Sequence, residues 1–221
     1  MLAKLDRAHG KLTPAKLDGP FEMILWEIVA YLADDAQWAL AFEALRTRVG
    51  LTPKQILAAP LKVLGEITRI GGSIAPAERA ERLQTAARLA IEEFNEFDGG
   101  LASVLQLPPQ KAKKLLMRFP MIGEPGAEKI LLSCGALDVL ALESNGLRTL
   151  VRLGIGEDRK SYTATYKSVR EVTLEELPGD STMLIQAHLL LRKHGQEVCL
   201  RNAPLCHACA ANSDCRHFRN L

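Results

Sequence analysis

The segment CLRNAPLCHACAANSDC, residues 199–215, decides how this chain is interpreted, because it brings four cysteines together in the spacing C-x6-C-x2-C-x5-C. These cysteines are Cys199, Cys206, Cys209 and Cys215. Thiolates crowd in this way when a metal holds them, and four sulfur ligands satisfy either zinc or an iron–sulfur centre. Structural zinc sites usually pair two C-x2-C knuckles, whereas only Cys206 and Cys209 form one here, so the spacing favours iron–sulfur.

Two disulfides are the alternative use of the same four cysteines. No secretory signal precedes them, and the fifth cysteine, Cys134, stands alone in an apolar, helix-like run. The sequence therefore predicts a metal-cluster segment, with zinc and disulfides as the alternatives.

Composition predicts a cytoplasmic, soluble protein with one sizeable core or two small ones. The chain has 221 residues, is 48% hydrophobic and lacks an apolar run long enough to span a bilayer. The net charge of +2 is small, so a nucleic-acid role must rest on local clusters of basic residues.

The sequence has two clusters of basic residues. The first consists of Lys111, Lys113, Lys114, Arg118 and Lys129. The second consists of Arg192, Lys193, Arg201, Arg216 and Arg219. A solvated helix face explains either cluster equally well.

Apolar residues recur at helical spacing along most of the chain, and alternating β-branched runs are missing, so the sequence predicts an all-α fold. The first 20 residues, with Pro14 and Gly19-Pro20, are predicted to be a loosely structured lead-in. Helices are predicted at 21–32, 36–49, 52–59, 60–67, 76–94, 101–105, 108–118, 125–133, 138–153, 161–174 and 180–194.

The segment 108–133 predicts a helical hairpin. A first helix ends at Phe119-Pro120-Met121-Ile122-Gly123, and a second opens at Glu124-Pro125-Gly126. Such a turn can direct backbone N–H groups at a DNA phosphate from the N-terminus of the second helix. Helix pairs with this kind of turn are also common as purely structural elements.

Together, Phe-Pro-x-Ile-Gly, the His194-Gly195 pair and the cysteine spacing resemble the endonuclease III branch of the helix-hairpin-helix DNA glycosylases, over about Pro20 to Cys215. The resemblance implies a two-lobed all-helical fold with a 4Fe-4S cluster on the four cysteines. It places a six-helix hairpin lobe at 21–137, a second lobe at 1–20 plus 138–198, and the cluster loop and tail at 199–221. It further implies that DNA binds between the lobes with a nucleotide flipped out of the duplex.

The hairpin departs from the family pattern where the chemistry is carried. The family's two glycines fall on Met121 and Gly123, and the lysine of its bifunctional members falls on Pro125. That lysine forms a Schiff base with the sugar and so permits strand cleavage, which proline cannot do. Lys129 lies one turn further along the same helix face and is either a substitute amine or a surface lysine.

The resemblance assigns two catalytic carboxylates. Glu143 stands where the family has an aspartate that stabilises the sugar cation, although a helix-start glutamate also serves the helix dipole. Glu27, in a stretch similar to the early helix of adenine-mismatch glycosylases, stands where a glutamate protonates the leaving base, or else lies on an exposed helix face. Leu32 falls where relatives insert a glutamine into the duplex, so it is expected to act as a wedge.

We therefore expect a DNA N-glycosylase that hydrolyses the glycosidic bond without strand cleavage, acting as a monomer on double-stranded DNA with a damaged, mispaired or abasic site. The alternatives are a catalytically impaired DNA-binding paralogue and a bifunctional enzyme with an unusual amine. The predicted DNA-binding residues are Leu32, Met121, Ile122, Gly123, Pro125, Gly126 and Lys129.

Overall fold

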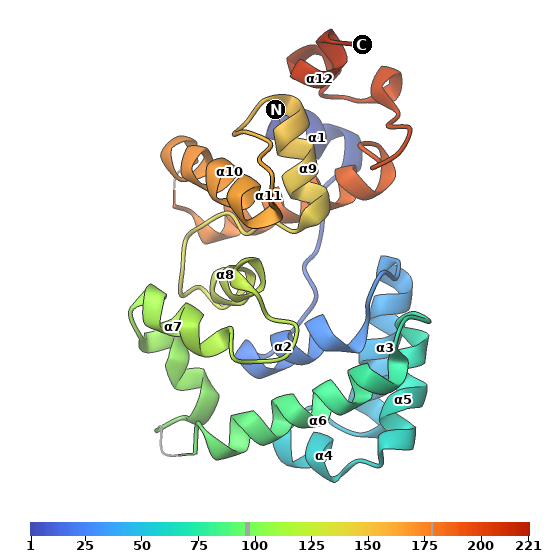
Figure 1. The fold of residues 1–221 in the computed structure, drawn as a ribbon, viewed down its shortest axis with the longest axis vertical. Helices are drawn as coiled ribbons and strands as arrows, with labels where there is room; N and C mark the ends of the chain where they lie inside the picture. The colour runs from blue at the N-terminus through green and yellow to red at the C-terminus, as the bar shows by residue number, and fades with distance from the viewer. Residues whose placement is uncertain (96–97, 178) are drawn as a thin grey trace. The chain divides into compact units, whose positions relative to one another are not determined.

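The chain folds into helices joined by loops, with no β-strand in residues 1–95, 98–177 and 179–221, which are those that the computed structural model describes (Figure 1). The prediction of an all-α fold is confirmed. In chain order the helices are α1 (Leu2–His9), α2 (Gly19–Val29), α3 (Asp35–Arg48), α4 (Pro53–Ala58), α5 (Leu61–Ile70), α6 (Pro76–Glu92), η1 (Gly100–Gln106), α7 (Pro109–Leu116), α8 (Glu124–Ser133), α9 (Ser144–Leu153), α10 (Tyr162–Glu176), α11 (Ser181–Glu197), η2 (Cys206–Ala208), η3 (Asn212–Asp214) and α12 (Arg216–Arg219).

The helices form two compact units. The hairpin unit consists of Lys16–Ala136 and contains α2 to α8. The terminal unit consists of Met1–Ala15 and Leu137–Leu221, so it combines α1 with α9 to α12. Among the described residues, no helix is long and apolar enough to cross a membrane.

The hairpin unit is built around α2 and α6. Helix α2 is almost entirely apolar, and α6 packs against α2, α4 and α5 (Figure 1). Buried alanines on α6, including Ala86 and Ala87, leave room for these helices to approach closely. Asp34 and Thr52 form capping boxes, in which their side chains accept from the N–H groups of Gln37 and Gln55 in the first turns of α3 and α4. These bonds fix where both helices begin.

Two predicted boundaries in the terminal unit are wrong. The first 20 residues are not a loose lead-in throughout, because α1 forms at Leu2–His9 and buries Leu5 completely as it packs against α11. An eight-residue helix is marginal alone, so this packing supplies its stability. The predicted helix at 138–153 begins only at Ser144, and the preceding apolar residues, Val139 to Leu142, are buried outside any regular helix.

Candidate functional site

The four C-terminal cysteines all line one small cavity in the terminal unit. Arg152 of α9 helps to shape it: its Nη1 lies 3.4 Å from Cys199 Sγ and donates to the Leu200 carbonyl at 2.6 Å. The Cys215 thiol in turn donates to the Arg152 carbonyl at 3.3 Å. The fold therefore gathers the predicted ligands around one helix, while Cys134 lies in the hairpin unit.

The donor set fits a thiolate-bound metal centre. The thiols lie close enough to affect one another. Burial, followed by the proximity of Cys199 and Cys215, raises the pKa of the Cys206 thiol. Bound metal would reverse this penalty by neutralising the thiolates. In the described ranges, no group of three or more His, Cys, Asp or Glu side chains is arranged to hold a single metal ion. A cubane cluster has four metal atoms and accepts more widely spaced sulfurs than a single ion does.

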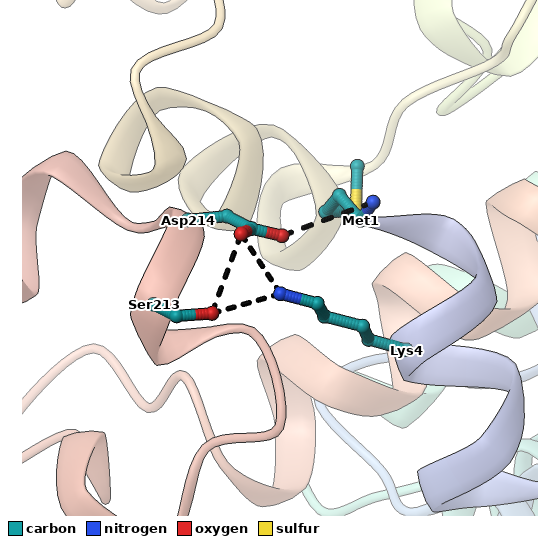
Figure 2. A network of polar contacts seen from close by, with 4 residues as sticks. All are labelled: Met1, Lys4, Ser213 and Asp214. Carbon is teal, nitrogen blue, oxygen red and sulfur yellow. Dashed lines mark hydrogen bonds and ion pairs between the residues drawn. The ribbon is translucent and has the colours of Figure 1, made fainter.

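The N-terminal helix holds the cysteine segment in place. Lys4 Nζ donates to Ser213 Oγ and to Asp214 Oδ1, both at 2.8 Å, and the Met1 amine lies 3.9 Å from Asp214 Oδ2 (Figure 2). Both acceptors lie between Cys209 and Cys215. The contacts are exposed, so they order the loop more than they stabilise the fold.

A pair of histidines adjoins Cys209. His194 Nε2 lies 3.3 Å from Cys209 Sγ, and its Nδ1 lies 3.0 Å from His9 Nε2. Burial, followed by the proximity of His9, lowers the pKa of His194 to about 4. At neutral pH His194 is therefore uncharged and carries one ring N–H, so it can donate to only one of these two neighbours.

Glu143 is the N-cap of α9, and both its carboxylate oxygens accept hydrogen bonds. Oε1 accepts from the Gly146 N–H at 2.7 Å, and Oε2 accepts from Asn145 Nδ2 at 2.9 Å. Arg148 donates to Asn145 Oδ1 at 2.9 Å and to the Cys199 carbonyl at 3.0 Å, so these contacts run from Glu143 to the cysteine segment. Burial and then the charge of Glu143 raise the pKa of the nearby Tyr162. The arrangement holds a fixed negative charge at the start of α9.

The structure brings Glu27 and Lys129 together in the hairpin unit. Lys129 Nζ of α8 lies 2.5 Å from Glu27 Oε1 of α2, as an ion pair without hydrogen-bond geometry. Both side chains are more than four-fifths buried. As a pair, the ammonium is no nucleophile and the carboxylate is no proton donor, so neither group performs its predicted chemistry until the pair opens.

The hairpin turn is conformationally strained at the first family glycine position. Met121 has φ of 64°, in the left-handed region that a glycine enters freely and a methionine does not. Ile122 is buried, and its N–H donates to the Phe119 carbonyl at 3.2 Å, which closes the turn. Gly123, by contrast, has φ of −90° and caps α8. An added Cβ there would meet only Pro125 Cδ, at 3.8 Å, so neither backbone nor packing demands glycine.

The hairpin offers fewer anion contacts than the sequence suggests. Pro125 removes one N–H from the first turn of α8, and Glu124 adds a negative charge beside it. Lys113 is buried and pairs with Glu124 at 3.0 Å and Glu128 at 2.9 Å. Of the basic residues in this stretch, Lys111 and Lys114 are exposed and have no partner among the described residues.

Leu32 lies just beyond the C-terminus of α2 and projects from the surface. The predicted helix at 21–32 ends at Val29, and Leu32 itself is left-handed, with φ of 50° and 76% exposure. The neighbouring Tyr31 is also an exposed large apolar residue.

Sequence reasoning missed Arg148 and Arg152 as supports of the cysteine segment. Their spacing of four residues, which puts Arg148 and Arg152 on one face of α9, is the sequence feature that could have indicated this role.

An all-helical chain with this hairpin, an N-capping carboxylate and a four-cysteine segment has the features of the endonuclease III-like class. No family model matches the chain. It is 25% identical to endonuclease III of Sulfolobus acidocaldarius over 200 residues, and the aligned region covers 90% of this chain and 82% of that protein. It is 26% identical over 176 residues to the DNA glycosylase/AP lyase ROS1 of Arabidopsis thaliana, covering 75% of this chain but 12% of ROS1.

Solved structures agree on the fold. Endonuclease III trapped as a covalent intermediate with DNA matches with a TM-score of 0.75 at 20% identity, over 99% of this chain and 94% of that one. A thermostable thymine-DNA glycosylase matches with a TM-score of 0.70 at 15% identity, over 100% of this chain and 94% of that one. The chain is thus endonuclease III-like in sequence and fold, and the resemblance seen in its motifs is confirmed.

Proposed function

We propose that the protein is a DNA N-glycosylase that removes a damaged or mispaired base by hydrolysis and leaves the strand intact. Its likeness in sequence and fold to DNA glycosylases supports the general activity. The observation that carries the mechanism is Glu143, a carboxylate fixed by two hydrogen bonds at the start of α9. Pro125, which has no amine, supports hydrolysis without strand cleavage.

In the proposed reaction, the bond between C1′ and the base breaks and its electron pair leaves with the base. Positive charge then develops on the sugar, and the Glu143 carboxylate stabilises it before water adds at C1′ and releases a proton. The Gly146 N–H and Asn145 amide hold the carboxylate as an acceptor, so little reorganisation accompanies the reaction. Glu27 is the proposed proton donor to the base, which requires that it first separate from Lys129 and take up a proton from solvent.

For DNA binding we propose double-stranded DNA as the partner of a monomeric protein. Leu32 would enter the base stack, and the backbone of Met121, Gly123 and Gly126 would approach phosphates. The exposed Lys111 and Lys114 would add salt-dependent attraction. When bound, a 4Fe-4S cluster would supply four iron–thiolate bonds to Cys199, Cys206, Cys209 and Cys215 and fix the C-terminal segment.

The test is base release from duplexes that carry uracil, an oxidised pyrimidine, mismatched adenine or thymine, or an alkylated purine. Cluster-loaded protein should release at least one base and leave an intact abasic site. Glu143→Gln should lower release by about a hundredfold or more while keeping DNA affinity, because it removes charge with little change of shape. Glu171→Gln, which alters an exposed glutamate of α10, is the control.

A second candidate function, lesion binding without catalysis, is favoured by the Glu27–Lys129 pair. It predicts tight binding to lesion duplexes with no base release from any of them. A bifunctional enzyme that uses Lys129 is the third alternative, and covalent trapping on abasic DNA distinguishes it from the other two.

A further inference from the structure

Arg79 is a buried arginine of α6 whose guanidinium bonds only to backbone carbonyls. Its Nη1 donates to the carbonyls of Val29 at 3.0 Å and Gly71 at 2.9 Å. Its Nη2 donates to those of Thr68 at 2.7 Å and Gly72 at 2.5 Å. The side chain is 1% exposed, although the proposed catalytic and DNA-binding residues do not include it.

No carboxylate pairs with Arg79 among the described residues, so its charge is met by carbonyl dipoles alone. Those carbonyls lie at the C-terminal ends of α2 and α5, where a cation complements the helix dipoles. Burial, followed by the proximity of Arg82, lowers the pKa of Arg79, but an arginine stays charged. Burying a charge without a carboxylate partner is costly. The planar guanidinium of Arg79 offsets part of this cost with its carbonyl bonds, and in doing so it links the ends of two helices.

These bonds also join two loops. The Tyr31 N–H donates to the Gly71 carbonyl at 2.9 Å. A Cβ on Gly71 would meet the Val29 carbonyl oxygen at 2.5 Å, and one on Gly72, where φ is 118°, would meet the Tyr31 carbonyl oxygen at 2.5 Å. The backbones around residues 29–31 and 71–72 are therefore in contact. The buried guanidinium of Arg79 donates hydrogen bonds to carbonyls of both segments.

Leu32 follows directly from the clamped segment. Its left-handed backbone and its 76% exposed apolar side chain are both unfavourable for an isolated leucine. Such a conformation persists when surrounding contacts fix the chain on either side of it. The contacts of Val29 and Tyr31 with Arg79 and Gly71 supply that constraint on the N-terminal side.

We propose that Arg79 is a positioning residue that holds the loop of residues 30–33 in the conformation from which Leu32 enters the DNA duplex. The proposal rests on the DNA-binding function proposed above. It predicts that Arg79 affects recognition of a vacant stacking position, through Leu32, and does not affect general attraction to DNA.

The experiment compares the affinity of the full-length protein for two duplexes, one intact and one with a tetrahydrofuran abasic analogue. Leu32→Ala removes most of the apolar surface that would enter the base stack, so it should lower the preference for the abasic duplex by about tenfold, equivalent to about 1.4 kcal/mol. Arg79→Lys keeps the charge but cannot reach both helix ends, and it should lower the preference severalfold. Arg82→Lys is the matched control, because Arg82 is a partly exposed arginine of α6 that pairs with Glu78.

A double-variant cycle separates positioning from general damage to the fold. If Arg79 acts through Leu32, Arg79→Lys should have no further effect on the preference once Leu32 is alanine. Gly72→Ala displaces the Tyr31 carbonyl while Arg79 is unchanged, so it should lower the preference for the abasic duplex as Arg79→Lys does. This variant tests the proposal independently if the Arg79 variants fold poorly.

Several outcomes would overturn the proposal. One is a preference that Arg79→Lys and Gly72→Ala leave unchanged, and another is a loss that adds fully to that of Leu32→Ala. If Leu32→Ala itself has no effect, there is no wedge for Arg79 to position, although glycosylase activity could still stand. If the unaltered protein binds neither duplex, the DNA-binding function itself fails.

Discussion

The hairpin and helix α9 use their basic residues in opposite ways. In the hairpin, Lys113 and Lys129 pair with carboxylates of their own unit, so their charge is neutralised inside the protein. In α9, Arg148 and Arg152 bond to backbone carbonyls of the cysteine segment and have no carboxylate partner in the part of the chain described. A count of basic residues in sequence therefore predicts little about where positive charge remains available.

The two regions also differ in how much of their predicted chemistry the structure supports. The hairpin forms its predicted turn, but Pro125 has no amine and Lys129, one helical turn later, lies in an ion pair. The α9 region retains a carboxylate and hydrogen bonds that link it to the cysteine segment. The proposed catalysis therefore depends more on the polar network of α9 than on the hairpin side chains.

The largest expected effect lies in the cysteine segment. Alanine at Cys199, Cys206, Cys209 or Cys215 should each abolish stable incorporation of iron and acid-labile sulfide, because a cubane needs one thiolate for each iron. Anaerobically prepared protein should contain about four of each per chain, measured by metal and sulfide analysis. Cys134→Ala should leave both values unchanged, since Cys134 lies in the other unit. Stoichiometric zinc without sulfide would contradict the cluster.

The next effect should be on the stability of the hairpin. Lys113 is buried against Glu128, which is also buried, and Lys113→Met leaves that carboxylate without this partner. Breaking a buried pair costs about 3–5 kcal/mol, whereas Lys114→Met on the exposed face should cost less than about 0.5 kcal/mol. Denaturant unfolding of the two variants measures the difference. Equal stabilities would show that the buried pair does not hold α7 against α8.

The pH dependence of this pair follows from its contacts. Burial alone would lower the pKa of Lys113, but hydrogen bonds and charges from Glu128 and Glu124 outweigh it and raise the pKa. A raised lysine pKa contributes stability that is complete below the unfolded value of 10.5 and is lost as the pH rises through the folded value. The pair should therefore be fully effective at neutral pH.

Much of the architecture follows from local sequence, and the failures have a common cause. Prolines in the first turn mark the starts of α4, α6 and α8, and Thr52 also caps α4. The periodicity of apolar residues indicates how far these helices extend. Helix α1 was missed because its stability comes from burying Leu5 against α11, at the far end of the chain. The buried, non-helical residues before Glu143 were predicted as helix because a short apolar run has no periodicity that distinguishes a helix from a buried loop.

The candidate site divides in the same way. Spacing alone predicted that the four cysteines form one group, and the structure places all four around one cavity. The family resemblance predicted Glu143 at the start of a helix, although the apolar pattern predicted a helix that begins earlier, at residue 138. The Glu27–Lys129 pair could not be foreseen, because it joins α2 to α8 through tertiary packing. The fixed orientation of Glu143 also depends on Asn145, whose side chain only the folded helix brings back to its carboxylate.

A smaller effect is expected at Gly123. The protein itself does not require glycine there, so Gly123→Ala should leave thermal stability nearly unchanged. If the turn approaches a phosphate, the added methyl should weaken binding to all duplexes by about threefold, since phosphate contacts carry no sequence information. Fluorescence anisotropy at several salt concentrations measures this. Unchanged affinity would remove this turn from the DNA interface.

Replacing Lys129 should have the smallest effect of these changes, because we expect it to leave covalent trapping on abasic DNA unaltered. Borohydride should not trap the protein on abasic DNA above the background of its N-terminal amine, and Lys129→Ala should not alter that background. The reason is that Pro125 offers no amine, while Lys129 is held as an ammonium against Glu27. Pro125→Lys is the informative counterpart, because it restores an amine at the hairpin position and should create trapping if the turn approaches the sugar. Strong trapping by the unaltered protein that disappears in Lys129→Ala would show that the ion pair opens on DNA, and the protein would then be a bifunctional glycosylase.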